Sequence, residues 1–301
     1  MIRIGVDFGG TKIEAAALGA DGDFKARVRK PNPGDYTGAL EIVREVVWEA
    51  EAQAGVSGAT IGIGAPGSLS PKTGRMRNAN SVWLNDKPFK DDLERTLGRP
   101  IRLENDANCF ALSEALSGAA KGSVAVFGAI LGTGCGGGVI VHGKTVEGVN
   151  RIGGEWGHTP LPWPSADERA AHTCWCGRSN CLETWVSGTG FCQDYERETE
   201  EKLTGDVIME RARTGEAAAT AAFDRYCDRL GRALAVICDI LDPDVIVFGG
   251  GMSNTDELYS RVPPIVAHYA FSDVFVTAIR KAEFGDSSGV RGAAWLWPLE
   301  T

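Results

Sequence analysis

Two glycine-rich turns, each between two short apolar stretches, constrain the fold of this chain most strongly. Residues 2–8 alternate apolar side chains, pass through Gly9-Gly10-Thr11-Lys12, and continue as an apolar run over residues 13–18. Residues 124–131 run in the same way into Gly132-Thr133-Gly134 and more glycines, before the apolar residues 139–141. This pattern predicts two strand–turn–strand units. The two units resemble each other in design and lie about 120 residues apart, which suggests two related halves whose turns face a shared site.

A third glycine-punctuated strand and several helical stretches complete the pattern. The buried-type run over residues 245–248 predicts a central strand that ends in a glycine triplet. Helical periodicity covers residues 40–54, 107–119 and 217–241. Strands that alternate with helices predict an α/β fold. We expect a domain boundary near residues 118–123, and a final helix over residues 289–297 that packs back on the first domain.

The glycine turns are suited to a polyphosphate, which needs backbone N–H groups at close range without an intervening Cβ. The first turn also offers the Thr11 hydroxyl and the Lys12 cation, while Asp7 can reach magnesium through water. The second turn offers another cradle. The alternative is that both are plain hairpin turns. The sequence contains no P-loop pattern and no well-formed dinucleotide fingerprint, so neither a P-loop NTPase nor a Rossmann dehydrogenase fits.

The two turns and the glycine triplet together resemble the nucleotide site of the sugar kinase–actin–Hsp70 superfamily. In that superfamily two turns hold the phosphates, and a late glycine-rich strand end borders the adenosine. The resemblance implies ATP and Mg²⁺ as cofactors. The positions that it implies for nucleotide binding are Asp7, Gly9, Gly10, Thr11, Lys12, Gly132, Thr133, Gly134, Gly249, Gly250 and Gly251.

A candidate base lies where a helix is predicted to begin. Glu104, Asn105 and Asp106 precede the helical stretch from residue 107. A carboxylate at this point can accept a proton from a substrate hydroxyl during phosphoryl transfer. Asn and Asp are also the preferred N-cap residues. The two interpretations are compatible, since Asn105 can cap the helix while Asp106 faces the substrate.

Three of the eight cysteines lie within eight residues, as Cys174, Cys176 and Cys181. Three thiolates and one imidazole form a closed tetrahedral shell, which suits structural zinc. His158 and His172 are rival candidates for the fourth ligand, and a disulfide or simple buried thiols are the alternatives. A cluster plus scattered single cysteines indicates a reducing compartment rather than a disulfide framework.

The acidic residues around this cluster have two possible roles. Glu155 and Glu183 could hold sugar hydroxyls or be exposed loop carboxylates.

The net charge of -9 and the pI near 5.1 argue against a nucleic-acid partner. The sequence shows no secretory signal and no apolar run approaching the length of a membrane helix. We therefore expect a cytoplasmic protein without a membrane partner.

The motifs, taken in order, resemble those of the ROK group (repressors, open reading frames, kinases) over essentially the whole chain. No single piece is specific, but the combination is. The matching pieces are Asp7-x-Gly-Gly-Thr-Lys12, Gly64-Ala-Pro-Gly67, Glu104-Asn-Asp-Ala-Asn108, Leu131-Gly-Thr-Gly134, Gly154-Glu-Trp-Gly-His158, Cys174-x-Cys-Gly-x3-Cys-Leu-Glu183 and Gly249-Gly-Gly251.

This resemblance implies a two-domain actin-like ATPase fold, with ribonuclease H-like domains and an active site in the interdomain cleft. The expected domains are residues 1–118 with 289–301, and residues 119–288, the latter carrying the zinc site. It implies that Asp106 is the catalytic base. It also implies the zinc ligands His158, Cys174, Cys176 and Cys181, so that the metal braces the loop that carries Glu155. The implied sugar-pocket residues are Gly67, Asn80 (with Asn78 as an alternative), Asn105, Asp106, Glu155, His158 and Glu183.

Several stretches look most like bacterial fructokinase/mannokinase, among them residues 67–71, 78–81, 154–162 and 289–297. N-acetylglucosamine kinases of the group are also similar, but more often carry Phe where this chain has Trp156. We therefore expect ATP-dependent phosphorylation of fructose, with mannose as a second sugar, to the 6-phosphate. The alternatives are an N-acetylglucosamine kinase or a glucokinase.

Proteins of a different class within the group are repressors, which place a helix-turn-helix domain before the kinase-like part. Here the first glycine turn begins at residue 9, which leaves no room for such a domain. A catalytically dead sugar-binding protein is a third possibility, and the presence of Asp106 and both turns argues against it. A homodimer is the usual finding in the group, so we expect one here.

Overall fold

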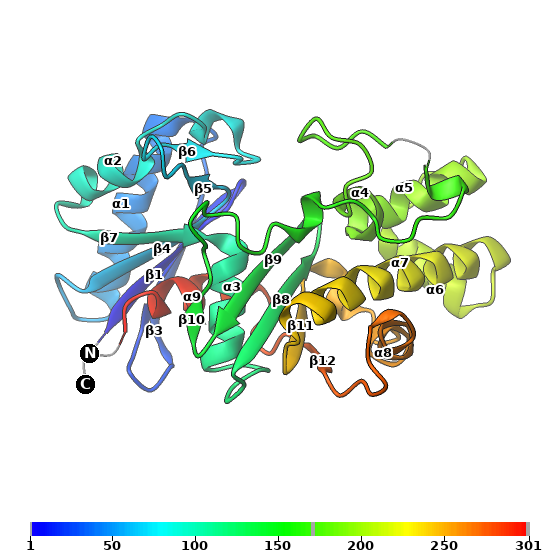
Figure 1. Cartoon of the computed structure of the whole chain (residues 1–301). Coiled ribbons are helices and arrows are strands. Elements are labelled where there is room, and N and C mark those ends of the chain that lie inside the picture. Colours follow the sequence, from blue (N-terminus) through cyan, green and yellow to red (C-terminus); the bar gives the residue numbers. More distant parts are fainter. Residues whose placement is uncertain (1, 170–171, 299–301) are drawn as a thin grey trace. The chain divides into compact units, whose positions relative to one another are not determined.

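The computed structural model describes residues 2–169 and 172–298, which divide into two compact units (Figure 1). The first unit holds the chain up to Lys121, the segment Gly138–Gly154 and the stretch from Glu283 onward. The second unit holds Gly122–Gly137 and Glu155–Ala282. Both are α/β, as the alternation of strands and helices predicts.

The first unit is built on a five-stranded sheet of order β3-β2-β1-β4-β7. The first three strands pair antiparallel, and β4 and β7 continue the sheet in parallel with β1. The strands are β1 (Arg3–Phe8), β2 (Lys12–Leu18), β3 (Phe24–Pro31), β4 (Thr60–Ala65) and β7 (Ile101–Asn105); a small ribbon adds β5 (Ser68–Leu69) and β6 (Met76–Arg77). The helical elements are α1 (Tyr36–Gln53), η1 (Val82–Leu84), α2 (Phe89–Leu97), α3 (Asp106–Leu116), η5 (Gly285–Ser287) and α9 (Ser288–Trp295).

Successive side chains of β1 point to opposite faces of the sheet, so the two faces of the strand pack against different helices. Ile4, Val6 and Phe8 join the apolar core with the buried residues of α1. On the other face, a Cβ at Gly5 would collide with the backbone of α9, so only glycine lets that helix lie against the strand. Asp7 shares this second face, near the first turn of α9. The predicted return of the last helix onto the first domain is therefore confirmed.

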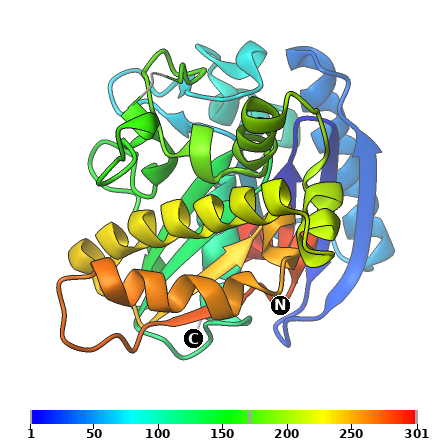
Figure 2. The same ribbon diagram turned by 90° about the vertical axis from the view of Figure 1, so that its right-hand side faces the viewer.

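The second sheet has the order β10-β9-β8-β11-β12, and β11 is parallel to both β8 and β12. Its strands are β8 (Ala125–Leu131), β9 (Cys135–Val141), β10 (Lys144–Thr145), β11 (Val245–Gly249) and β12 (Ala278–Lys281). The helices of the second unit are η2 (Trp156–His158), η3 (Asp167–Arg169), α4 (Glu183–Val186), α5 (Gly188–Thr199), α6 (Gly205–Arg213), α7 (Ala217–Leu241), η4 (Gly251–Asn254) and α8 (Leu258–Tyr269). The long α7 runs beside α8 (Figure 2).

The two sheets share one plan, which bears out the prediction of two related halves. In each, the strand before a glycine turn is flanked on one side by the strand that follows the turn, and on the other by a later parallel strand. The helix predicted over residues 217–241 is α7 with those bounds, and the remaining predicted helices are α1, α3 and α9. The Pro-rich polar stretch over residues 161–172 predicts a loop, and its residues 170–171 lie outside the described residues.

The compact units differ from the predicted domains in two segments. The chain does cross between units at residues 121–122, inside the predicted boundary stretch. However, residues 138–154 group with the first unit, where a Cβ at Gly138 would lie only 2.6 Å from the carbonyl oxygen of Ala107. Residues 283–288 also group there, because the buried Glu114 carboxylate accepts the Glu283 N–H at 3.0 Å and the Ser288 hydroxyl at 2.7 Å. Both contacts join segments far apart in sequence, so local patterns do not reveal them.

Among the described residues, no helix is both long and apolar enough to span a bilayer.

Candidate active site

The first glycine turn, between β1 and β2, is closed by its own backbone. The Gly9 N–H donates to the carbonyl of Lys12 at 3.0 Å, and a Cβ at Gly9 would lie 2.9 Å from the same oxygen. The Asn32 side chain donates to the Gly9 carbonyl at 2.8 Å, and its backbone N–H donates to Thr11 at 3.0 Å. Asn32 thus braces the turn from the end of β3. Sequence reasoning missed this residue, because nothing in its local pattern points to the turn.

Asp7 lies near the end of β1, beside this turn. Burial, helped by the neighbouring carboxylates of Asp106 and Glu14, raises the pKa of Asp7 to about 7, while Lys12 and Arg29 oppose the shift. A buried carboxyl group among other carboxylates is costly to ionise, and a bound cation relieves that cost. Asp7 is therefore well placed to meet a hydrated magnesium ion.

The predicted helix start is confirmed at α3. The Asn105 side chain accepts the N–H groups of Ala107 at 2.9 Å and Asn108 at 3.4 Å, which is an N-cap. Its amide also donates to the Gly67 carbonyl at 3.2 Å, so two of the predicted sugar-pocket residues are joined. Asp106 is the first residue of the helix, is exposed, and accepts the Ala107 N–H at 2.8 Å.

Glu104, directly before the cap, is a residue that sequence reasoning named only as part of a motif. Its carboxyl accepts the Asn105 N–H at 2.7 Å and the Asn108 side-chain amide at 3.0 Å. Burial raises its pKa to about 7, although these two hydrogen bonds oppose the shift, and the Glu147 carboxyl adds to it. Glu104 thus holds both the cap residue Asn105 and the first turn of α3.

The segment between the end of β4 and η1 carries other predicted sugar contacts of the first unit. Gly67 has a φ of +79°, and a Cβ there would collide with the Arg77 carbonyl, so the position requires glycine. Asn78 and Asn80 are both exposed. The Asn85 side chain holds Ala79, which lies between them, through two hydrogen bonds of 3.0 and 3.1 Å. The choice of Asn80 over Asn78 stays a prediction.

The second glycine turn, between β8 and β9, borders a cavity of about 640 Å³ in the second unit. A Cβ at Gly250 would lie 2.6 Å from Leu131, so the end of β11 approaches the turn only because this residue is glycine, with a φ of +78°. The volume lies in the range of small-molecule sites, and the wall mixes apolar and polar groups. It is lined by Leu131, Gly132, Thr133, Gly188, Thr189, Cys192, Leu203, Thr204, Gly205, Asp206, Met209, Arg213, Gly251, Met252, Asn254 and Thr255.

Of the predicted nucleotide positions in this unit, Gly132, Thr133 and Gly251 line the cavity. Gly249 is the buried last residue of β11. Helix α5 begins against the turn, because the Gly188 N–H donates to the Gly132 carbonyl at 2.7 Å. The residues from α5 and α6 were not predicted, and glycine at the start of each helix is their only local signal.

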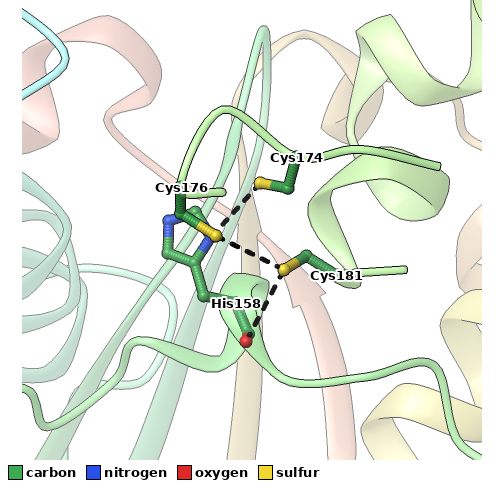
Figure 3. Close-up of side chains that lie close together, drawn as sticks. All are labelled: His158, Cys174, Cys176 and Cys181. Carbon is green, nitrogen blue, oxygen red and sulfur yellow. Dashed lines mark hydrogen bonds between the residues drawn. The ribbon is translucent and has the colours of Figure 1, made fainter. Parts of the chain in front are cut away.

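The four predicted zinc ligands come together in the second unit (Figure 3). Their ligand atoms all lie within 4.8 Å of one another, with Cys174 Sγ 3.6 Å from His158 Nδ1 and Cys176 Sγ 3.6 Å from Cys181 Sγ. Tetrahedral zinc with Zn–S bonds near 2.3 Å separates sulfur ligands by about 3.7 Å, so the geometry fits the metal. The rival His172 instead packs its ring against Trp185, at 4.4 Å between centroids.

The segment that carries Glu155 and His158 is anchored by Trp156. This buried side chain donates its indole N–H to the Gly136 carbonyl at 2.8 Å and packs edge-on against Phe127. Glu155 and His158 flank the anchor, both half-buried. The segment is thereby fixed to the start of β9 at one end and to the cysteine cluster at the other.

Glu183, the first residue of α4, uses both carboxylate oxygens. Oε2 accepts the backbone N–H of Cys135 at 3.0 Å, directly after the second glycine turn. Oε1 accepts the indole N–H of Trp175 at 2.6 Å, and Cys174 Sγ lies 3.8 Å from the same oxygen. The predicted role as a sugar ligand is not tested by these contacts, which do show that the carboxylate is held in one place.

Each unit thus presents part of the chemistry that a phosphoryl transfer needs. The first offers a closed glycine turn, a magnesium-suited carboxyl group and an exposed aspartate at a helix N-terminus. The second offers a glycine turn beside a cavity of ligand size, and a Cys/His cluster beside two glutamates.

Comparison with known proteins agrees with the motif pattern. The model of the ROK family matches residues 3–300. N-acetyl-D-glucosamine kinases from Vibrio cholerae and Pectobacterium atrosepticum are 40% and 39% identical over 297 residues, which is 97% of this chain and 98% and 97% of theirs.

Among solved structures, a ROK hexokinase from Thermus thermophilus superposes with a TM-score of 0.87 at 30% identity, covering 98% of this chain and 97% of the other. A ROK family glucokinase from Streptomyces griseus, in complex with glucose and AMPPNP, superposes with a TM-score of 0.80 at 28% identity, over 98% of this chain and 99% of the other. The family match and the identities extend over nearly the whole chain, and the chain therefore belongs to the ROK family.

Proposed function

We propose that this protein is an ATP-dependent sugar kinase that transfers the γ-phosphoryl group of ATP to a hydroxyl of N-acetylglucosamine. The observations that support the reaction are the position of Asp106 at the start of α3 and the presence, in each unit, of a glycine turn suited to phosphates. The choice of N-acetylglucosamine as the substrate rests on the 39–40% identity to N-acetyl-D-glucosamine kinases over 97% of the chain. Phosphoryl transfer depends mainly on positioning and charge stabilisation, and these residues supply both.

In the proposed mechanism, Asp106 accepts the proton of the attacking sugar hydroxyl. The Asn105 cap and Glu104 hold the helix start, and with it Asp106, in place. The turns at residues 9–12 and 132–134 direct backbone N–H groups at the phosphates. Asp7 would hold a hydrated magnesium ion, which would supply positive charge beside the phosphates. Exclusion of water favours transfer to the sugar over hydrolysis.

We propose a structural role for zinc at His158, Cys174, Cys176 and Cys181. Four protein ligands make a closed shell with no open position for catalysis. If Nδ1 of His158 binds the metal, its other ring nitrogen stays available for a sugar hydroxyl. The metal would then fix the short segment that also carries Glu155.

Fructose is the second candidate substrate. The stretches at residues 67–71, 78–81 and 154–162 resemble fructokinase/mannokinase, and this chain has Trp156 where the N-acetylglucosamine kinases of the group more often have Phe. The full-length identities favour N-acetylglucosamine over this reading. We further propose a cytoplasmic homodimer, the usual state in the group.

A coupled ADP-release assay with ATP and magnesium, run in parallel on N-acetylglucosamine, fructose, mannose and glucose, tests the proposal. We expect kcat/KM on N-acetylglucosamine to exceed that on every other sugar by 10-fold or more, since a site that hydrogen-bonds an amide leaves groups unpaired when the amide is missing. A preference for fructose would contradict the proposed substrate but leave the proposed mechanism unchanged. No turnover on any sugar would favour a non-catalytic sugar sensor.

Asp106→Asn should lower kcat by about 10³-fold, in line with the loss of a general base, while the sugar Kd measured by calorimetry changes less than about threefold. The matched control is Asp91→Asn, the same change in the first turn of α2, which should leave turnover intact. Near-normal turnover of the Asp106 variant would remove this residue from the role of base.

Asp7→Asn should abolish magnesium-dependent turnover and yet stabilise the fold at pH 8. The pKa of Asp7 is raised to about 7 in the folded chain, so its stabilising contribution is present below the unfolded value near 3.8 and is lost as pH rises to 7. Above pH 7 the ionised group costs stability, and the amide avoids that cost. Urea unfolding should show a gain of about 1–3 kcal/mol at pH 8 that shrinks toward pH 4. A pH-independent difference, or a loss at pH 8, would contradict this account.

Elemental analysis should find one zinc per chain. Cys181→Ser should lose the metal and lower the melting temperature by about 6–12 °C, the shift that a loss of about 3 kcal/mol gives in a protein of this size. Cys238→Ala, which changes a cysteine of α7 outside the cluster, should keep the full zinc content. A wild-type protein that contains no zinc after purification without chelators would refute the metal assignment.

A further inference from the structure

The Glu183 carboxylate connects two parts of the second unit that the proposed reaction uses separately. One oxygen holds the backbone directly after the second glycine turn, through the Cys135 N–H at 3.0 Å. The other holds the tip of the cysteine cluster, through the Trp175 indole N–H at 2.6 Å. Hydrogen bonds to an ionised carboxylate are stronger than neutral ones, so both links are significant restraints.

The glycine turn and this carboxylate also depend on each other sterically. A Cβ at Gly134 would lie 2.7 Å from Glu183 Oε2, closer than a real contact allows. The same residue closes the turn, because its carbonyl accepts the Gly132 N–H at 3.0 Å. A displacement of the carboxylate therefore changes the space available to the turn that is expected to hold phosphate.

Trp175 is in turn held from both sides. It lies in sequence between the cluster cysteines Cys174 and Cys176, and its ring packs edge-on against His158, with 5.1 Å between centroids. Nevertheless 58% of the side chain is exposed, which is unusual for a tryptophan with two directed contacts. Its indole is thus a fixed donor beside the cluster rather than part of the apolar core.

The Glu183 carboxylate retains acceptor capacity after both contacts. Each carboxylate oxygen has two lone-pair sites. Oε1 meets both the Trp175 indole N–H and Cys174 Sγ, whereas Oε2 accepts only the Cys135 N–H among these contacts. The second site of Oε2 can accept a sugar hydroxyl without releasing Trp175 or Cys135. One side chain can thus meet sugar and phosphate turn at the same time.

We propose that Trp175 is a positioning residue that holds Glu183 so that sugar binding and ATP binding strengthen each other. The inference rests on the proposed function and on the predicted role of Glu183 as a sugar ligand. A sugar bound to the Glu183 carboxylate restrains this side chain, which in turn restrains the second glycine turn. By linkage, a nucleotide bound to the turn must increase the affinity for the sugar by the same factor by which the sugar increases the affinity for the nucleotide. The indole N–H is required because without it one carboxylate oxygen loses its restraint.

The test is Trp175→Phe, which keeps an aromatic ring and removes only the donor. Calorimetry gives the Kd of N-acetylglucosamine, or of the best substrate in the panel, alone and with a saturating non-hydrolysable ATP analogue, and the Kd of the analogue alone. We expect the analogue to tighten sugar binding at least fivefold in the wild-type protein and less than twofold in the variant. The Kd of the analogue alone should stay within about twofold, because the turn itself is intact.

Two further variants separate positioning from general damage. Trp48→Phe changes a tryptophan of α1 that is 54% exposed, and should retain wild-type coupling. Trp175→Gln restores an N–H donor and should recover part of the coupling. The zinc content should remain one per chain in all three variants.

Unchanged coupling in zinc-loaded Trp175→Phe would overturn the inference, as would loss of zinc from that variant, which would make the residue a support of the cluster alone. Wild-type protein that turns over sugar but binds sugar and analogue independently would also overturn it, while leaving the proposed function intact. Absence of both sugar binding and turnover in the wild-type protein would instead refute the proposed function, and this inference with it.

Discussion

The burial of carboxyl groups at one edge of the first sheet is the constraint on which the first unit's chemistry depends. β1, β4 and β7 run parallel, so their carboxyl ends meet at one edge of the sheet, and Asp7, Glu104 and Asp106 lie there. The pKa values of Asp7 and Glu104 both rise to about 7, mainly because the groups are buried. This edge is costly for the empty protein and is relieved by a cation or by donors from a substrate. A site for a magnesium nucleotide and a polyhydroxylated sugar meets both needs.

The sequence predicts those parts of the fold and site that depend on neighbouring residues. The hairpins around the glycine turns, the Asn105 cap and the group of three cysteines follow from local patterns, and the structure contains all of them. The choice of His158 over His172 comes only from the resemblance to the ROK group, because spacing leaves both open. The braces from Asn32, Asn85 and Glu104 could not be predicted, because an ordinary polar residue gives no sign of its distant partner. The same holds for residues 138–154, which group with the first unit through a close approach to α3.

The fold does not determine which sugar the protein phosphorylates. Homologous kinases and a hexokinase share this architecture, so the architecture alone does not select a substrate. Selection among sugars depends on a few hydrogen bonds, each worth about 1–3 kcal/mol when a buried partner is left unpaired. In this chain such bonds would come from loops. These loops are held in place by close contacts at glycines, by Asn85 and by the cysteine cluster. Short motifs therefore favoured fructose, whereas identity over the full chain favours N-acetylglucosamine.

The most direct test of the account is a crystal structure of the protein with N-acetylglucosamine and a non-hydrolysable ATP analogue with magnesium. The central claim is that Asp106 activates a sugar hydroxyl for attack on the γ-phosphate. It predicts one hydroxyl oxygen within about 3.2 Å of the Asp106 carboxylate and in line with the terminal phosphate. A sugar whose nearest carboxylate is Asp7 or Glu104, or whose hydroxyls all lie out of reach of Asp106, would contradict it.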